Sequence, residues 1–202
     1  MSFEKVYVLD TNILLEDATN IFKLSDEKKN LIVLPETVLD EIDSKKGGFD
    51  EINFQAREFA RILENSKIID TKKEENFKIV RLEIQTQKEA IIDVISCEEY
   101  AINTKNVALN IINDRKILEV GLFAKRHYDE NTTFLSLDIM ARTRAVSLDI
   151  KTDSLVGSNQ EEFNYEFIKT IEIKFEDTEH LDNALITNFD SEYAPHNFKL
   201  LF

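Results

Sequence analysis

The sequence contains a single cysteine, Cys97, so no disulfide can form within the chain. Only four glycines and two prolines occur among its 202 residues, which argues against long disordered tracts. The apolar runs are far shorter than the roughly 20 residues that cross a membrane. The opening stretch MSFEKVYVLD also lacks the basic and apolar regions of a signal peptide. We therefore expect a folded, cytoplasmic protein that binds no membrane.

Further absences narrow the chemistry. No Gly-rich loop ends in Gly-Lys-Ser/Thr, so ATPase activity is not expected of this chain. The three histidines, at positions 127, 180 and 196, form no metal-ligand spacing. The formal net charge of −14 opposes nucleic-acid binding, because Lys and Arg displace the counterions of phosphate groups. Small basic groups nevertheless occur at Lys45-Lys46, Arg57-Arg61, Arg115-Lys116, Lys125-Arg126 and Arg142-Arg144.

The sequence does contain an alternation of strand and helix patterns. Short apolar and β-branched runs predict strands at 6–9, 31–34 and 134–137. Helical periodicity predicts helices at 12–16, 36–45, 53–66, 114–126 and 139–148. Alternating apolar residues at 77–85 and 90–96 indicate a β-hairpin insertion, which we interpret as peripheral. This order predicts an α/β fold with three layers, α/β/α, around a mostly parallel sheet.

The length fits one well-buried α/β domain, residues 1–155, with an extension over residues 156–202. In that extension the patterns predict a strand at 163–175, a short helix at 181–186 and a strand at 197–202. We expect this C-terminal α+β extension to complete the fold or to dock a partner.

Four acidic residues stand where such a sheet collects its ligands. Asp10 and Asp138 each follow a predicted strand directly, Glu41 lies on the helix after the second strand, and Asp114 opens a later helix. Ligands of open parallel sheets bind at the carboxyl ends of the strands, so all four could reach one site. Grouped carboxylates repel one another unless a cation lies between them. Oxygen ligands alone favour Mg²⁺ or Mn²⁺, whose expected chemistry is phosphodiester hydrolysis by activated water.

Each acid also has an ordinary structural interpretation. Asp10 and Asp114 are suited to capping helices, and Glu41 could pair with Lys45 four residues later. Acids at strand ends are common by chance in a chain with 39 acidic residues. The prediction therefore depends on the set of four.

Four strings resemble the motifs of PIN domains. VLDTNILL at 8–15 resembles the opening signature, in which a strand runs into Asp-Thr-Asn. LPETVLDEID at 34–43, NDRKIL at 113–118 and SLDIMARTRA at 136–145 are similar to the second, third and fourth motifs. The resemblance covers about residues 4–155. It is closest to PIN domains that precede a PhoH-type ATPase module, partly because of Asn53–Glu58 and the predicted hairpin.

This resemblance implies that residues 1–155 are a PIN-like nuclease domain that hydrolyses single-stranded RNA, as an endoribonuclease. The implied metal-binding and catalytic residues, with Mg²⁺ or Mn²⁺, are Asp10, Glu41, Asp114 and Asp138. The residues implied to orient these carboxylates and the attacking water are Thr11, Asn12 and Ser136. Arg57 and Arg142 are the implied contacts to substrate phosphate. The expected partners are RNA, a second copy of the chain, and an antitoxin or an ATPase.

Other functions fit the sequence less well. An aspartate-nucleophile phosphatase needs a second Asp two residues after the first, where this chain has Asn12. A receiver domain needs paired acids near the first strand and a late Lys, and no such set can be placed. The stronger alternative is a catalytically silent PIN fold that serves as an RNA-binding or protein-interaction scaffold. The acidic charge favours this alternative, whereas the presence of all four acids opposes it.

Overall fold

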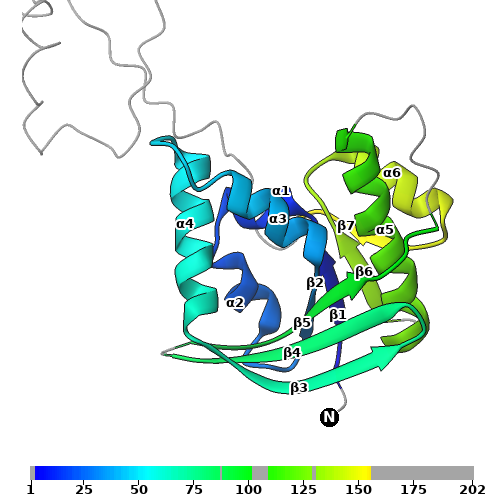
Figure 1. The fold of residues 1–202 in the computed structure, drawn as a ribbon, viewed down its shortest axis with the longest axis horizontal. Coiled ribbons are helices and arrows are strands. Elements are labelled where there is room, and N and C mark those ends of the chain that lie inside the picture. The colour runs from blue at the N-terminus through cyan, green and yellow to red at the C-terminus, as the bar shows by residue number, and fades with distance from the viewer. Residues whose placement is uncertain (1–2, 87, 102–108, 129–130, 156–202) are drawn as a thin grey trace, which may run out of the picture. The chain divides into compact units, whose positions relative to one another are not determined.

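A seven-stranded sheet of order β3-β4-β5-β2-β1-β6-β7 forms the middle layer of the protein, whose structure is a computed structural model (Figure 1). The structure describes residues 3–86, 88–101, 109–128 and 131–155. The predicted three-layer α/β fold with a mostly parallel sheet is confirmed. The elements expected in the C-terminal extension, 156–202, lie outside the described residues.

The parallel part of the sheet is built around β1 (Val6–Leu9). This strand lies between β2 (Leu31–Pro35) and β6 (Thr132–Leu135), and it is parallel to both. The short edge strand β7 (Lys151–Asp153) continues the parallel order beyond β6. Every residue of β2 is buried, as expected for a strand whose two faces are covered by other layers. Because β1 lies between β2 and β6, its end places Asp10 near the middle of the sheet, at the carboxyl ends of the parallel strands.

The predicted hairpin is present, but our interpretation of it as peripheral was wrong. Its strands are β4 (Phe77–Gln85) and β5 (Glu89–Cys97). β5 pairs with β2 in parallel, so it is an interior strand of the sheet. The consecutive buried residues Ala90, Ile91 and Ile92 explain this position, because both faces of the strand are apolar. A further strand that the sequence did not predict, β3 (Ser66–Glu74), forms the edge beside β4.

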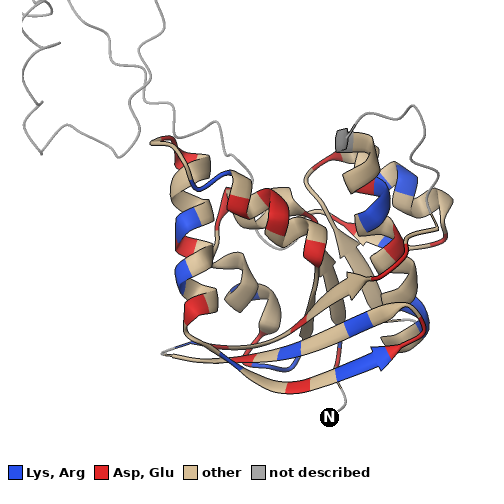
Figure 2. Ribbon diagram, in the orientation of Figure 1, with Lys and Arg blue, Asp and Glu red and all other residues tan. Residues whose placement is uncertain are grey.

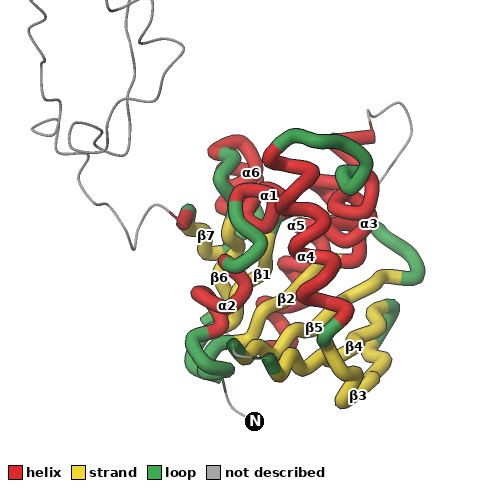
Figure 3. The backbone as a smooth tube through the Cα atoms, turned by 90° about the vertical axis from the view of Figure 1, so that its left-hand side faces the viewer, coloured by secondary structure: helices red, strands yellow, loops and turns green. Residues whose placement is uncertain are grey.

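Six helices flank the described part of the sheet: α1 (Thr11–Glu16), α2 (Asn20–Ser25), α3 (Glu36–Ser44), α4 (Glu51–Glu64), α5 (Leu109–Tyr128) and α6 (Ile139–Ser147). Helices α1, α3, α5 and α6 come together at one end of the domain, above the yellow strands in Figure 3. Among the described residues, no helix is long and apolar enough to cross a membrane.

Two predicted boundaries near the acids were wrong. α5 already begins at Leu109, so Asp114 lies inside the helix and does not open it. The side chains of Asn113 and Asp114 bond to other helices, which removes the capping role that their residue types suggested. β6 ends at Leu135, so Asp138 lies three residues beyond the strand, at the N-cap of α6. Beyond this strand end, Ser136 Oγ donates to Asp10 at the junction of β1 and α1, and the N–H of Leu137 donates to Asn12 on α1.

Candidate active site

Asp10 occupies the junction between β1 and α1 and is held there by neutral donors. Its Oδ1 accepts a hydrogen bond of 2.8 Å from the backbone N–H of Thr11. Its Oδ2 accepts bonds from Asn12 Nδ2 at 2.8 Å and from Ser136 Oγ at 2.6 Å. These bonds fix the orientation of the carboxylate, but none of the donors carries a charge that could neutralise it.

The environment raises the pKa of the Asp10 carboxyl above its ordinary value, chiefly because burial disfavours the charged form. The hydrogen bonds from Ser136 and Thr11 act in the opposite direction, because they stabilise the carboxylate. The negative charges of Glu41 and Asp114 raise this pKa further. Three of the four predicted acids are therefore close enough to influence one another.

Glu41 joins three helices. Its Oε2 accepts a bond of 2.5 Å from Thr11 Oγ1 on α1, and its Oε1 accepts a bond of 2.8 Å from Asn113 Nδ2 on α5. Glu41 itself is half-buried on α3, so these neutral partners replace the alternative pairing with Lys45. Sequence reasoning missed Asn113 as a site residue, although it stands next to Asp114 in the third motif.

Ser136 links the first and fourth motifs. This buried hydroxyl donates to Asp10 Oδ2 and accepts bonds from Asn12 Nδ2 at 3.1 Å and from the N–H of Asp138 at 3.0 Å. Asn12 completes the connection by accepting a bond of 3.0 Å from the N–H of Leu137. The Asp138 side chain is exposed and caps α6, where Oδ1 accepts a bond of 2.8 Å from the N–H of Met140.

Asp114 has a charged partner. Its Oδ2 forms an ion pair with Nη1 of Arg144, which comes from α6. Within the described part of the chain, Asp114 is the only one of the four acids in an ion pair. Sequence reasoning grouped Arg144 with other basic residues but did not assign it to the site. Figure 2 shows the basic residues of α5 and α6 close to the acidic residues at this end of the domain.

The four carboxylates do not converge on one point as they are placed. No three Asp, Glu, His or Cys side chains among the described residues stand close enough to hold a metal ion together. Glu41, Asp114 and Asp138 are each turned toward protein partners. The donor chemistry does fit a hard divalent cation, because the candidate ligands are carboxylate oxygens. Binding by three or more of these carboxylates would therefore require side chains to move from the contacts described above.

The two arginines predicted to contact phosphate both bond to backbone carbonyls. Arg57 Nη1 donates to the carbonyls of Lys46 at 2.9 Å and Gly48 at 2.7 Å, so it supports the α3–α4 loop. Arg142 Nη1 donates to the carbonyl of Ser136 at 2.5 Å. Phosphate contact by either residue stays a prediction.

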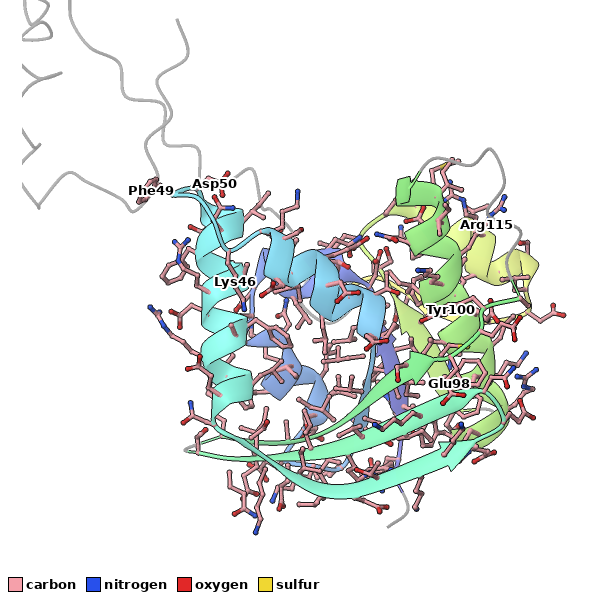
Figure 4. The ribbon with its side chains drawn as sticks, in the orientation of Figure 1. Lys46, Phe49, Asp50, Glu98, Tyr100 and Arg115 are labelled. Carbon is pink, nitrogen blue, oxygen red and sulfur yellow. The ribbon has the colours of Figure 1, made fainter. Side chains whose placement is uncertain are left out.

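The α3–α4 loop follows α3, the helix that carries Glu41, and begins at Lys45. The amide of Asn53 bonds to the carbonyl of Lys45 at 2.6 Å, and Asp50 and Asn53 form a capping box at the start of α4. A Cβ atom at Gly48 would lie 1.9 Å from Asn53 Oδ1, so a larger residue would force the Asn53 amide to move out of its place in the capping box. Phe49 projects from the loop into solvent near the top of α4 (Figure 4).

Comparisons with known proteins agree with the motifs. A family model described as PIN domain matches residues 7–156. Protein PhoH2 of Bacillus subtilis (strain 168) is 28% identical over 158 residues, which are 76% of this chain and 33% of that protein. The chain thus spans about a third of this relative's length. A solved domain of a functionally unknown protein from Methanocaldococcus jannaschii DSM 2661 aligns with a TM-score of 0.44 and 16% identity, covering 84% of this chain and 98% of that one.

Proposed function

This chain belongs to the PIN domain family, and from that premise we propose that it is a metal-dependent ribonuclease. The family consists generally of metal-dependent nucleases, which typically use divalent ions. The observation that supports the proposal best is the pair Asp10 and Glu41, two neighbouring carboxylates that are held by neutral donors. Their mutual repulsion contributes to the raised pKa of Asp10, and a bound cation would relieve it.

The proposed ligands of Mg²⁺ or Mn²⁺ are Asp10, Glu41, Asp114 and Asp138. When bound, the ion would activate water and stabilise negative charge on the phosphate. The chain's own contribution is orientation. Ser136 and Asn12 hold Asp10 against the loop that carries Asp138, and Thr11 and Asn113 hold Glu41 between α1 and α5.

We further propose single-stranded RNA as the substrate and endonucleolytic cleavage as the reaction. A second copy of the chain, an antitoxin and an ATPase are the proposed protein partners, and residues 156–202 are proposed to complete the fold or to dock one of them. These finer assignments come from the resemblance of the four motifs and require their own tests.

The test is cleavage of circular and linear single-stranded RNA in Mn²⁺ or Mg²⁺ by the wild type, Asp10→Asn and Asp138→Asn. Removing a metal ligand should lower the rate by more than the roughly 10- to 100-fold typical of outer-shell partners. Asp40→Asn is the matched control, because Asp40 is an exposed acid next to Glu41 on α3. Cutting of the circular substrate identifies an endonuclease. If the wild type is no more active than both site variants with either metal on several RNAs, the ribonuclease proposal is wrong.

A second candidate is a catalytically silent PIN scaffold that binds RNA or protein. The observation that favours it is the placement of the acids, because no three of them converge among the described residues. This candidate predicts that RNA binding is unaffected by Asp10→Asn and that Mn²⁺ causes no cleavage. Binding and cleavage measured on the same samples separate the two functions.

A further inference from the structure

Arg144 is the one arginine near the candidate acids whose described contact is with an acid and not with the backbone. It lies on α6 and pairs with Asp114 on α5. Arg57 and Arg142, by contrast, are tied to backbone carbonyls. The side chains of Arg144 and Asp114 are 39% and 36% exposed, so solvent can replace either partner at modest cost. Arg144 can therefore exchange its contact more readily than Arg57 or Arg142.

Any cation that uses Asp114 must compete with this ion pair. The guanidinium group occupies Oδ2 of Asp114, so a cation that approaches this carboxylate either takes Oδ2 or binds Oδ1 beside the guanidinium group. In both cases the cation repels the guanidinium group at close range. Cation binding thus weakens the contact between Asp114 and Arg144 and favours release of the Arg144 side chain.

A space for the displaced group lies beside it. Arg144 lines a groove of about 940 Å³ that follows the outer side of α5. Leu118, Leu122 and Leu148 contribute apolar surface to this groove. Its charged lining is mixed: Arg115 and Arg126 add guanidinium groups, and Glu75, Glu99 and Glu119 add carboxylates, of which Glu75 pairs with Arg126. Figure 4 labels Arg115 on α5 at this side of the domain. A guanidinium group suits phosphate because its planar fork can donate two parallel hydrogen bonds.

From these contacts we propose that Arg144 exchanges partners: it neutralises Asp114 in the metal-free protein and contacts a substrate phosphate once a divalent cation binds Asp114. This inference rests on the proposed ribonuclease function. It also gives one residue two roles, because the same charge that lowers cation affinity in the free protein strengthens RNA binding in the cation-loaded protein. Arg144 would thereby couple the two binding events.

The first test measures cation binding without RNA. Isothermal titration with Mn²⁺ should show a two- to fivefold higher affinity for Arg144→Ala than for the wild type, on the order expected for loss of an exposed competing ion pair. Arg61→Ala is the matched control, because Arg61 forms an exposed ion pair with Glu58 on α4 and the substitution removes the same charge. Affinity for Mn²⁺ should be unchanged in Arg61→Ala.

The second test measures RNA binding over a series of salt concentrations, with and without Ca²⁺ as the probe cation and with the integrity of the RNA checked by gel. In the wild type, Ca²⁺ should steepen the salt dependence by about 0.7, the value for one added phosphate contact on a single strand. Arg144→Ala should lose this increment, and Arg144→Lys should keep it but bind several-fold more weakly than the wild type, because lysine lacks the planar fork. Arg61→Ala should behave like the wild type.

The results separate this inference from the function on which it rests. If the wild type binds Mn²⁺ and cleaves RNA, but Arg144→Ala matches Arg61→Ala in cation affinity and in salt dependence, the partner exchange is wrong and the nuclease proposal stands. If the wild type neither binds Mn²⁺ nor cleaves RNA, both are wrong. Circular dichroism spectra establish that Arg144→Ala is folded, and Arg144→Lys supplies the same comparison should the alanine variant be unstable.

Discussion

Asp93 and two of the candidate acids, Asp10 and Glu41, belong to the same domain but have opposite electrostatic settings. Asp93 on β5 is 0% exposed and receives two bonds of 2.7 Å from the guanidinium group of Arg81. The hydroxyl of Tyr128 donates a third bond of 2.5 Å to the same carboxylate. A buried charge is tolerated when it is paired and fully hydrogen-bonded, and Asp93 meets both conditions.

The Tyr128 hydroxyl is a permanent donor in this arrangement. Burial and the adjacent negative charge of Asp93 raise the pKa of Tyr128 well above its usual range, so the hydroxyl keeps its proton at neutral pH. The cluster of Arg81, Asp93 and Tyr128 joins β4, β5 and α5 and leaves no charge uncompensated. These contacts are those of a cluster that stabilises the fold.

In the candidate site, Asp10 and Glu41 have hydrogen bonds without neutralisation. Asp10 and Glu41 accept bonds from hydroxyl, amide and backbone donors, and Asp114 has Arg144 as its charged partner. In the candidate site the carboxylate oxygens accept hydrogen bonds, but the negative charges outnumber the positive ones. This surplus of negative charge distinguishes the site from the Asp93 cluster. The difference teaches that charge compensation, more than burial or acid count, separates a structural carboxylate from one suited to bind a cation.

The largest effect is expected from breaking the Asp93 cluster. Arg81→Ala leaves a fully buried carboxylate without its cation, which should lower the free energy of unfolding by about 3–5 kcal/mol. Arg61→Ala breaks an exposed ion pair and should cost no more than about 1 kcal/mol. Equilibrium urea denaturation measures both values. Similar losses for the two variants would show that the Asp93 cluster is not the support described here.

Adding Mn²⁺ should stabilise the wild type through the candidate site. At a free Mn²⁺ concentration of about 100 times Kd, the gain in the free energy of unfolding should be about 2.7 kcal/mol, because the ion binds only the folded state. Asp10→Asn should lose most of this gain, and Asp40→Asn should keep it. Thermal denaturation with and without the ion provides the measurement. An equal gain in Asp10→Asn would place the ion elsewhere.

Thr11→Val tests whether the bond to Glu41 orients that carboxylate. The substitution removes the hydroxyl but preserves the side-chain shape, and we expect Mn²⁺ affinity and cleavage rate to fall by roughly 10- to 100-fold. Thr11→Ser retains the donor and should restore most of both. Titration of the metal and initial cleavage rates are the measurements. Loss of function in the serine variant as well would point to a packing role for the threonine methyl group.

The smallest effect is a pH dependence. The proposed cation would bind the ionised form of Asp10, and burial raises the pKa of Asp10, so protons should compete with Mn²⁺ at a higher pH than for an ordinary aspartate. In the metal-free protein the raised pKa contributes stability below the ordinary value, and this contribution is lost as the pH rises through the raised value. Stabilisation by Mn²⁺ should therefore increase with pH across that interval.

Melting temperatures with and without Mn²⁺, from about pH 4 to about pH 8, cover this interval. Asp10→Asn has no carboxyl group to titrate at this position and should show a flatter dependence. If both proteins respond to pH alike, another group governs the cation binding.

Much of the fold was predictable because it depends on local pattern. The apolar runs before Asp10 and in β2, and the helical periodicity of α3 and α6, are local signals that the structure confirms. The position of β5 was not predictable in this way, because periodicity does not reveal that a hairpin strand pairs with β2 across more than 50 intervening residues. β3 was not predicted for a different reason: its exposed and charged residues lack the alternation of apolar and polar side chains that indicates a strand.

The candidate site likewise has features that local sequence predicts and features that depend on how distant elements pack. The acids lay within recognisable motifs, so their approximate positions were readable, whereas the contacts of Asn113 and Arg144 depend on how α3, α5 and α6 pack together. Arg57 shows the converse. The sequence suggested a cation available to a substrate phosphate, whereas in the structure Arg57 donates hydrogen bonds to backbone carbonyls of the α3–α4 loop.

The bond between Ser136 and Asp10 joins residues that are 126 positions apart. During synthesis, the chain that emerges first contains β1, Asp10 and Glu41 but neither β6 nor the fourth motif. The central strand β1 cannot acquire its second neighbour, and the candidate site cannot assemble, until β6 has left the ribosome. Any activity that depends on this site is consequently absent until the fourth motif has been synthesised.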